Sequence, residues 1–452
     1  MKCLGAAVLL AIEFIAASVS AQTFTFRNVA GNATNTDGGS TDGANACAQF
    51  SFPSGVAADS LGHLYVADQN NCTIRKITPV GTNWIVCTIA GSAGDFNFNK
   101  VQDGTNSSAL FNFPTGIALD QSGNLFVADS GNNAIRKIIP MTGTTNWVVT
   151  TIAGKGPNNP GFANGANSAA RFNGPTGIAV DGSGNVFVAD QYNNAIRKIT
   201  PVAGTTNWVV TTIAGKGPNN PGFADGTNTA AQFDHPTGLA ADASGNLFVA
   251  DHDNNSIRMM TPSGTNWIVA IIAGGGPAFP GSSDGTNAAL FNGPASVAVD
   301  SAGNVYVADQ MNNTIRQLTP LGADWVCCTI GGQAQVNGTN PGSSTNALFY
   351  SPSGLAVDGK GAVFVADTDN NIIRIGFPPP AILSSALPFG LNQGQFGFLL
   401  TGPTAQPVVV QASSDMMSWL PIWSNTFGPG QLFFADPVVT PPAPRFYRLC
   451  LP

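Results

Sequence analysis

The chain has 452 residues, a formal net charge of −7 and only 10% charged side chains. This length allows two domains or one large repeat array. An acidic chain without a basic segment offers no electrostatic footprint for a phosphate backbone, so no binding to nucleic acid is expected. The 53 Gly and 31 Pro residues indicate many tight turns.

Residues 1–21 are predicted to be a signal peptide. Lys2 supplies the positive start, residues 4–17 are mainly apolar, and Val19-Ser20-Ala21 precedes a cleavage point ahead of Gln22. The alternative, a retained membrane anchor, is disfavoured because the apolar run is short and contains Glu13. We therefore expect a mature chain without a transmembrane segment, located outside the cytoplasm as a secreted, periplasmic or cell-surface protein.

The central part of the chain repeats one pattern six times. Its clearest copy, residues 177–197, joins Gly-Ile-Ala-Val-Asp, Gly-Asn-Val-Phe-Val-Ala-Asp and Asn-Asn-Ala-Ile-Arg. Successive copies lie 61, 61, 61, 58 and 58 residues apart, and a fixed long period indicates a repeat architecture. In each copy an Arg follows an Asp by seven residues, which gives the pairs Asp68 and Arg75, Asp129 and Arg136, Asp190 and Arg197, Asp251 and Arg258, Asp309 and Arg316, and Asp367 and Arg374.

One unit is predicted to contain four strands. Residues 177–181, 186–189, 195–199 and 207–215 are rich in apolar and β-branched residues, and Gly- and Asn-rich turns separate the first three. Four strands repeated radially make a β-propeller blade. The predicted fold class is therefore all-β, with a six-bladed propeller over residues 22–377.

The ring is predicted to be closed by the N-terminal strand. The sixth unit ends near Ile375 without a fourth strand, while residues 22–31 carry a spare one. Aligned on the final Gly of the strand, Phe24 takes the place of a Trp that recurs at Trp84, Trp147, Trp208, Trp267 and Trp325. This strand should complete the sixth blade and leave no open sheet edge.

These motifs resemble the NHL repeat family. The marks are Pro-Thr-Gly-Ile-Ala-Val-Asp, Gly-Asn-Val-Phe-Val-Ala-Asp and Asn-Asn-Ala-Ile-Arg-Lys, and the Thr-Ile-Ala-Gly segments are similar to the secreted bacterial, TolB-like branch. The resemblance covers residues 22–377 and implies a six-bladed propeller. It implies no single activity, because family members range from protein and RNA binders to lyases.

The repeated Asp and Arg residues have two interpretations. They could form a ring of charges for a polar ligand, or each pair could brace its own turn through hydrogen bonds. We favour the structural role, because all six blades contain the pair, whereas a ligand site usually breaks symmetry.

The fourth unit departs most from the repeat. It carries His235 before a Pro, and Asp251, His252 and Asp253 in the turn after the second strand. The turns and the Asp-Gly-Thr-Asn connections are expected to converge at one mouth of the central channel, where binding residues collect on a rigid scaffold. These four residues are the predicted binding site, against the alternative of drift at exposed turns. A ring of hydroxyl residues either lines the same mouth or simply begins the first strands; its members are Ser54, Thr115, Thr176, Thr237 and Ser353.

The sequence also suggests one disulfide and allows a comparison with calcium-binding loops. Export permits disulfides, and Cys47 and Cys72 are the preferred pair because both should lie on one face. Asp251 and Asp253 place oxygens at alternate positions as calcium loops do, but the Gly at the sixth position and the bidentate Glu are missing. We therefore assign no catalytic residue, no metal ligand and no cofactor, and calcium is the alternative to an empty site.

Residues 378–452 are predicted to be a linker and a small β-sandwich-like domain. Residues 377–380 are Phe-Pro-Pro-Pro, which is stiff, and residues 396–400, 408–412 and 431–434 read as strands. This domain resembles the small tails of secreted bacterial proteins and is expected to serve packing, sorting or attachment.

The expected function is an exported scaffold that binds an extracellular protein or polysaccharide through its loop-rich face. The alternative is a metal-dependent lactonase- or lyase-like enzyme with its site at the central channel. The resemblance implies His, Glu, Asp or Asn ligands for that enzyme, but the mature chain has no Glu and three His. Enzymatic activity is thus left open, with binding favoured.

Overall fold

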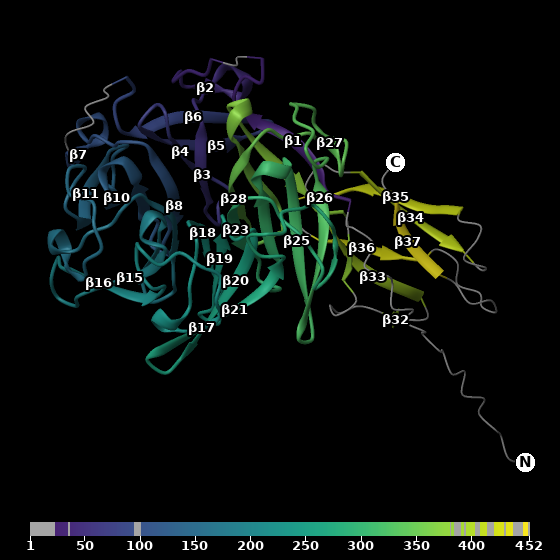
Figure 1. Ribbon diagram of the computed structural model, residues 1–452. Helices are drawn as coiled ribbons and strands as arrows, with labels where there is room; N and C mark the ends of the chain where they lie inside the picture. The colour runs from purple at the N-terminus through teal and green to yellow at the C-terminus, as the bar shows by residue number, and fades with distance from the viewer. Residues whose placement is uncertain are drawn as a thin grey trace, which may run out of the picture.

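The computed structural model contains a six-bladed propeller and a smaller C-terminal group of strands (Figure 1). It describes residues 23–34, 37–94, 101–379, 381–383, 390–392, 395–402, 407–413, 420–428, 431–436 and 446–450. The predicted signal peptide lies outside the described residues.

The first three blades are antiparallel sheets, each with one two-residue edge strand and four longer strands. The first contains β2 (Gly43–Ala44), β3 (Pro53–Ala58), β4 (Leu64–Asp68), β5 (Thr73–Val80) and β6 (Asn83–Ala90). The second contains β7 (Gly104–Thr105), β8 (Pro114–Leu119), β9 (Leu125–Asp129), β10 (Ala134–Pro140) and β11 (Trp147–Gly154). The third contains β12 (Gly165–Ala166), β13 (Pro175–Val180), β14 (Val186–Asp190), β15 (Ala195–Pro201) and β16 (Trp208–Ala214).

The last three blades follow the same plan, and the sixth takes one strand from the N-terminus. The fourth contains β17 (Gly226–Thr227), β18 (Pro236–Ala241), β19 (Leu247–Asp251), β20 (Ser256–Ser263) and β21 (Asn266–Gly274). The fifth contains β22 (Gly285–Thr286), β23 (Pro294–Val299), β24 (Val305–Asp309), β25 (Thr314–Leu321) and β26 (Asp324–Gly331). The sixth contains β27 (Gly342–Ser343), β28 (Pro352–Val357), β29 (Val363–Asp367), β30 (Ile372–Phe377) and β1 (Thr25–Ala30).

The six-bladed all-β fold predicted from the repeat is confirmed, with one addition to each blade. The second strand is buried along its whole length in every blade, as its continuous apolar run predicts. The sequence predicted four strands in a blade, whereas each sheet has five. The extra strand is short because only two residues of the long connection reach the outer strand, as Gly226 and Thr227 do against β21.

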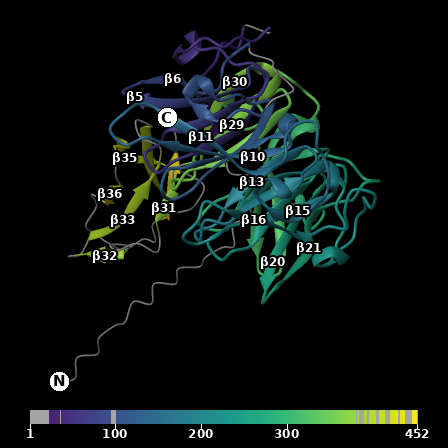
Figure 2. The same ribbon diagram turned by 90° about the vertical axis from the view of Figure 1, so that its left-hand side faces the viewer.

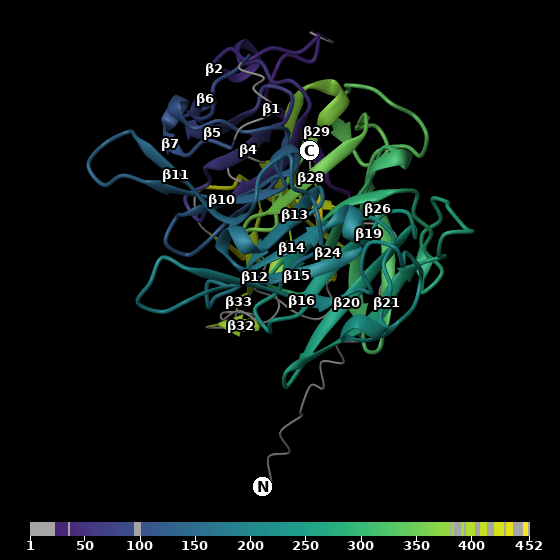
Figure 3. The same cartoon turned by 60° about the vertical axis from the view of Figure 1, so that its left-hand side comes forward.

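The N-terminal strand closes the ring as predicted. β1 pairs antiparallel with β30 and with the edge strand β27, so the sixth sheet runs β27-β1-β30-β29-β28. In Figures 1 and 3 the purple β1 lies among the green strands at the end of the propeller chain. Phe24 and Phe26 are fully buried, and Phe24 meets Tyr306 of the fifth blade edge-on at 6.1 Å.

The repeated tryptophans are structural, as their single strand position predicted. Four of the five meet an aromatic ring of the preceding blade edge-on, with ring centroids 5.7–6.0 Å apart; the pairs are Trp147 with Tyr65, Trp208 with Phe126, Trp267 with Phe187, and Trp325 with Phe248. Edge-to-face pairs of this kind add to the apolar burial that holds neighbouring blades together.

Short 3-10 helices occupy two places in the blades. Four follow an edge strand, namely η1 (Asn45–Cys47), η2 (Asn106–Ser108), η4 (Asn167–Ala169) and η6 (Asn228–Ala230). Four form the turn after a second strand, namely η3 (Ser130–Asn132), η5 (Gln191–Asn193), η7 (Gln310–Asn312) and η8 (Thr368–Asn370). Within the described residues, no helix has the length and apolar character needed to span a bilayer.

The buried Asp and Arg of every repeat pair with one another. All twelve side chains are fully buried, and the contacting oxygen and nitrogen lie 2.6–2.9 Å apart. Every Arg guanidinium also lies over a Phe ring from the connection that enters its blade, as Arg75 does over Phe50 at 5.1 Å. This geometry agrees with the structural interpretation and leaves no ring of charges exposed to a ligand.

The C-terminal strands form two small sheets around a core of their own. One sheet contains β31 (Ala381–Leu383), β32 (Gly390–Asn392), β33 (Gln395–Thr401) and β36 (Leu432–Ala435), and the other contains β34 (Pro407–Ser413), β35 (Leu420–Thr426) and β37 (Phe446–Cys450). Phe398, Leu400, Val408, Val410 and Phe434 pack together between them. Figure 2 shows these strands in yellow, and the arrangement is sandwich-like, as predicted.

Closure by β1 generates a first prediction. Deleting residues 22–31 removes the buried Phe24 and Phe26, each contributing about 1.5–3 kcal/mol, and exposes the edge of β30. A thermal melt followed by circular dichroism should show a fall of about 10 °C or more. A control truncation ending at Gln22 keeps β1 and should melt like the mature chain; an unchanged melt of the longer deletion would contradict closure.

Candidate functional site

The mouth of the central channel contains a cavity of about 260 Å³ that is lined by both polar and apolar groups. Its wall comes from the first strand of all six blades, and its rim from the turns that follow the second strands. Four rim residues hold the position directly after the repeated Asp, namely Gln69, Gln191, His252 and Gln310. Among the described residues that line this cavity there is no Asp, Glu, Lys or Arg.

The ring of hydroxyl residues fits both predicted roles, lining the channel mouth and beginning the first strands. Its members begin first strands, and they also line the cavity. Their hydroxyls donate to carbonyl oxygens of the next blade: Ser54 to Thr115 at 3.0 Å, Thr176 to Thr237 at 3.1 Å, and Ser353 to Ser54 at 3.0 Å. The ring therefore ties the blades together at the axis, and its hydrogen-bonding capacity is already partly used.

In five of the six blades the strands approach so closely at the axis that the third residue of the Pro-Thr-Gly or Pro-Ser-Gly motif is glycine, whereas the fifth blade has Ser296 there. A Cβ on Gly177 would lie 2.0 Å from the carbonyl oxygen of Thr237 in the next blade. The same contact measures 2.1 Å at Gly116 and at Gly354. A side chain at these Gly positions would clash with the backbone of the next blade, which explains the Gly of the motif.

The glutamine amides at the rim differ from the hydroxyls below them. Gln69, Gln191 and Gln310 are half-buried. Among the described residues, their side-chain amides have no hydrogen-bond partner. The equivalent Ser130 and Thr368 instead donate to carbonyls of the next blade, at Pro175 and Pro53. The rim thus offers three unpaired amides, each with donor and acceptor capacity.

The seams between blades are joined by a second repeated contact. The last residue of the turn is left-handed, and its side chain accepts the backbone N–H of the residue before the Pro in the next blade. Asn194 accepts from His235 at 2.9 Å, and Asn371 accepts from Phe52 at 2.8 Å across the closing seam. In the first blade Cys72 holds this position and accepts from the N–H of Phe113.

This contact explains why the predicted disulfide is absent. Cys47 and Cys72 are both free thiols in the structure, so the predicted pairing is wrong there. Cys72 is 1% exposed and packs in the seam with Ala90 and Phe111, while Cys47 is exposed in η1. Burial raises the pKa of the Cys72 thiol, as expected for an inert, structural cysteine.

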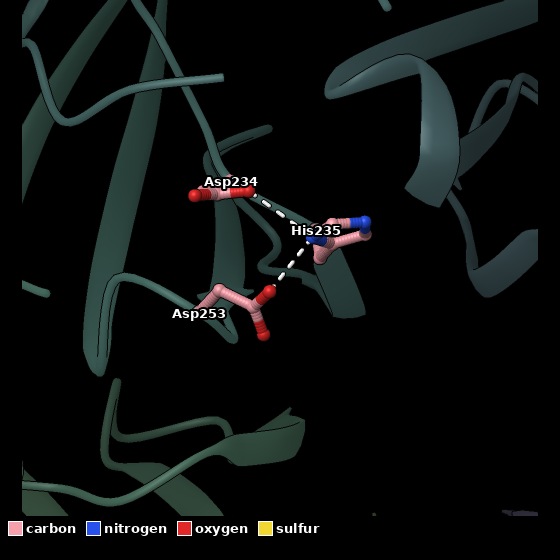
Figure 4. Close-up of side chains that lie close together, drawn as sticks. All are labelled: Asp234, His235 and Asp253. Carbon is pink, nitrogen blue, oxygen red and sulfur yellow. Dashed lines mark ion pairs between the residues drawn. The ribbon is translucent and has the colours of Figure 1, made fainter.

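The structure brings three of the four predicted site residues together. Nδ1 of His252 lies 2.6 Å from one oxygen of Asp253, and Nδ1 of His235 lies 2.7 Å from the other. His235 also approaches Asp234 at 3.1 Å, and its ring meets Tyr192 edge-on. In Figure 4 the two carboxylates flank His235 from separate loops, Asp234 before β18 and Asp253 from the turn after β19.

Asp251 does not belong to this group. Its carboxylate is fully buried and accepts hydrogen bonds from the N–H of Asp234, from Asn254 and from Arg258. Burial raises the pKa of Asp251 to about 6, although Arg258 opposes the shift. Because its oxygens are occupied, Asp251 and Asp253 do not face a common ion in the manner of a calcium loop.

The prediction that the Asp-Gly-Thr-Asn connections converge at the channel mouth is wrong. The Asp-Gly-Thr-Asn connections do not line the channel mouth among the described residues. Gly226 and Thr227 form an edge strand on β21, and Asp225 binds Arg258 at 2.6 Å. These connections therefore brace the outer rim of each blade, and the turns alone supply the mouth.

Sequence reasoning missed the glutamines as members of a site. The signal was present, since the position after the repeated Asp is the variable one, with Gln, Ser, Gln, His, Gln and Thr in successive blades. What the pattern could not give was the direction of these side chains, which depends on how each turn meets the axis.

The comparisons with known proteins agree with this fold. The family model for the NHL repeat matches residues 50–77, 111–138, 172–199, 233–258, 291–318 and 349–375. These segments run from the connection into each blade to its third strand, so all six blades are recognised. The chain belongs to the NHL repeat family, as a six-bladed β-propeller.

Individual relatives match over the propeller. The chain is 29% identical over 343 residues to Protein SUPPRESSOR OF QUENCHING 1, chloroplastic, of Arabidopsis thaliana, covering 73% of this chain and 30% of that protein. It is 29% identical over 357 residues to NHL repeat-containing protein 2 of Homo sapiens, covering 72% and 46%. The chain thus spans less than half the length of these relatives.

A solved structure shares the fold. A Bacteroides thetaiotaomicron protein of unknown function aligns with a TM-score of 0.57 at 20% identity, covering 78% of this chain and 76% of that one. This likeness shows the fold alone.

The Cys72 contact generates a second prediction. Cys72→Asn restores the side chain found at the five other seams, so the free energy of unfolding should rise by about 0.5–1.5 kcal/mol. Denaturant unfolding measures this change, and Cys47→Ser serves as the control that leaves stability unaltered. If the two cysteines were bonded, either substitution would instead cost about 2–5 kcal/mol.

Proposed function

We propose that this protein is an exported binding scaffold that takes a neutral, polyhydroxylated ligand, a glycan, at the mouth of its central channel. The observation that carries the proposal is the rim of unpaired amides above a wall that has no Asp, Glu, Lys or Arg among its described residues. Export is part of the proposal and follows from the predicted signal peptide. A protein partner is the alternative occupant of the same face.

The chemistry of the rim favours hydroxyl groups as partners. A side-chain amide donates through its NH₂ and accepts through its oxygen, and a sugar hydroxyl does both in return. Gln69, Gln191 and Gln310 are half-buried without a partner among the described residues, so a ligand that bonds them meets preplaced groups. Preplaced groups lower the entropic cost of binding.

The lining also disfavours charged ligands. Burying a carboxylate or phosphate without a counter-charge is costly, and no Lys or Arg among the described residues lines the cavity. The volume of about 260 Å³ lies just below the range of about 300–1,000 Å³ for drug-sized ligands. A cavity of this size suits one sugar unit of a longer chain.

The symmetry of the ring supports a binding role at this point. The wall repeats in five of the six blades because it holds the propeller together, and only the fifth blade departs from it, with Ala295 and Ser296. The rim does not repeat, since it carries three glutamines and one histidine while Ser130 and Thr368 are tied to the next blade. A ligand without six-fold symmetry is recognised by groups that break the symmetry.

The third prediction tests this site. Replacing Gln69 and Gln191 together by Ala should weaken glycan binding by about tenfold or more, because two hydrogen bonds of about 0.5–1.5 kcal/mol each are lost. The measurement is a glycan array on the purified chain, followed by titration calorimetry with the best glycan. Gln232→Ala, on an outer connection, is the matched control. Equal glycan binding by all three proteins would show that the glycan binds at another site. Binding of a protein partner and of no glycan would contradict the glycan proposal.

A second candidate function is the metal-dependent lactonase- or lyase-like activity. The observation that favours it is the hydrogen bond of 2.6 Å between His252 and Asp253 at the cavity. A carboxylate that holds Nδ1 of an imidazole orients the ring for proton transfer at Nε2.

The fourth prediction separates the two functions. The binding proposal predicts that the purified chain turns over a panel of lactones and cyclic esters no faster than buffer, because His252 then contacts ligand without chemistry. Product formation is followed by a pH-stat and mass spectrometry, with His252→Gln as the comparison. Turnover that needs His252 and is removed by EDTA would establish the enzyme instead.

A further inference from the structure

We propose that Asp234, His235 and Asp253 form a binding site for a divalent first-row transition ion of the zinc class on the rim of the fourth blade. One nitrogen of His235 and one oxygen of each carboxylate all lie within 4.8 Å of one another. The site is distinct from the channel cavity, because none of the three residues lines it.

Nδ1 of His235 is buried without a hydrogen-bond partner. Nδ1 has no contact with solvent, and it lies 2.7 Å from Asp253 and 3.1 Å from Asp234. Despite these short distances, neither oxygen is placed to complete a hydrogen bond with this nitrogen. A cation between the three atoms would satisfy the nitrogen and both oxygens at once.

The local charge also calls for a cation. In the described part of the chain, Asp234 and Asp253 form ion pairs with histidine only. The nearest repeated cation, Arg258, is fully buried and already bound to Asp251 and Asp225. Two adjacent carboxylates without a Lys or Arg repel one another, and a divalent ion offsets that repulsion.

The ligand types select the class of ion. Imidazole nitrogen favours zinc and its neighbours over calcium, which takes six to eight oxygens. Zinc with bonds of about 2.0–2.2 Å to three protein ligands leaves a fourth position for water. Asp253 is half-exposed on a turn, so this turn can shift to give the ligand spacing that zinc requires while the hydrogen bond from His252 is kept.

A further residue, His252, supports one of the proposed ligands. The other oxygen of Asp253 accepts from Nδ1 of His252 at 2.6 Å. Hydrogen bonds to a ligating carboxylate fix its orientation and contribute to metal affinity. The neighbouring blades lack this arrangement, because Gly174 and Gly293 stand where His235 does, and Tyr192 and Met311 stand where Asp253 does.

The fifth prediction is a zinc titration of the purified chain. The affinity tag is removed, accessible thiols are alkylated so that the exposed Cys47 and Cys87 do not compete, and metal is stripped with EDTA. Calorimetry with zinc chloride should show one saturable equivalent. His235→Ala and Asp253→Asn should each weaken it by at least about tenfold, since even outer-layer partners of a metal site cost that much.

The controls keep the proposal open to refutation. His63→Ala removes a histidine paired with a single carboxylate, Asp59, at 2.8 Å, and should bind zinc like the unaltered chain. Circular dichroism melts confirm that each variant is folded. Cobalt substituted for zinc should give a visible absorption band that His235→Ala abolishes. No saturable zinc binding, unchanged affinity in folded His235→Ala, or saturation by calcium alone would overturn the site.

Discussion

The buried pair of Asp and Arg in each blade is the interaction on which the rest of the propeller depends. In the third blade Arg197 binds Asp190 at 2.6 Å, the carbonyl oxygens of Arg171 and Ala163, and Asn164, and it lies over the ring of Phe172. One guanidinium thus joins the second strand, the entering connection and the outer edge. Neither charge is tolerated alone at such burial, where loss of one partner costs about 3–5 kcal/mol.

With the blades braced internally, the seams between them need only weak, repeated contacts. The left-handed Asn of five turns accepts one backbone N–H from the next blade, Cys72 does so in the first blade, and hydroxyls at the axis donate to neighbouring carbonyls. The Asp–Arg pair does not involve the first and second residues after the repeated Asp, and the proposed sites use these positions.

The fourth blade shows how side chains differ at such positions while the repeated contacts are kept. His235 keeps the backbone contact of its position, since its N–H still bonds Asn194 at 2.9 Å. His252 and Asp253 likewise sit in a turn whose buried Asp251 remains bound to Arg258. The side chains are thus free to differ without disturbing the brace. The same freedom produces the glutamine rim around the channel.

The number of blades, their strand order and the closure by residues 22–31 were determined by the sequence alone. The repeat period and the absence of a fourth strand at the end of the sixth repeat can both be read from the sequence. Burial of the apolar strands then admits few arrangements. Only the tertiary structure decided which side chains meet. Cys72 turns into the seam away from Cys47, Asp251 turns inward away from Asp253, and Asp234 joins His235. The reason is that these directions depend on packing between blades, which no spacing along the chain encodes.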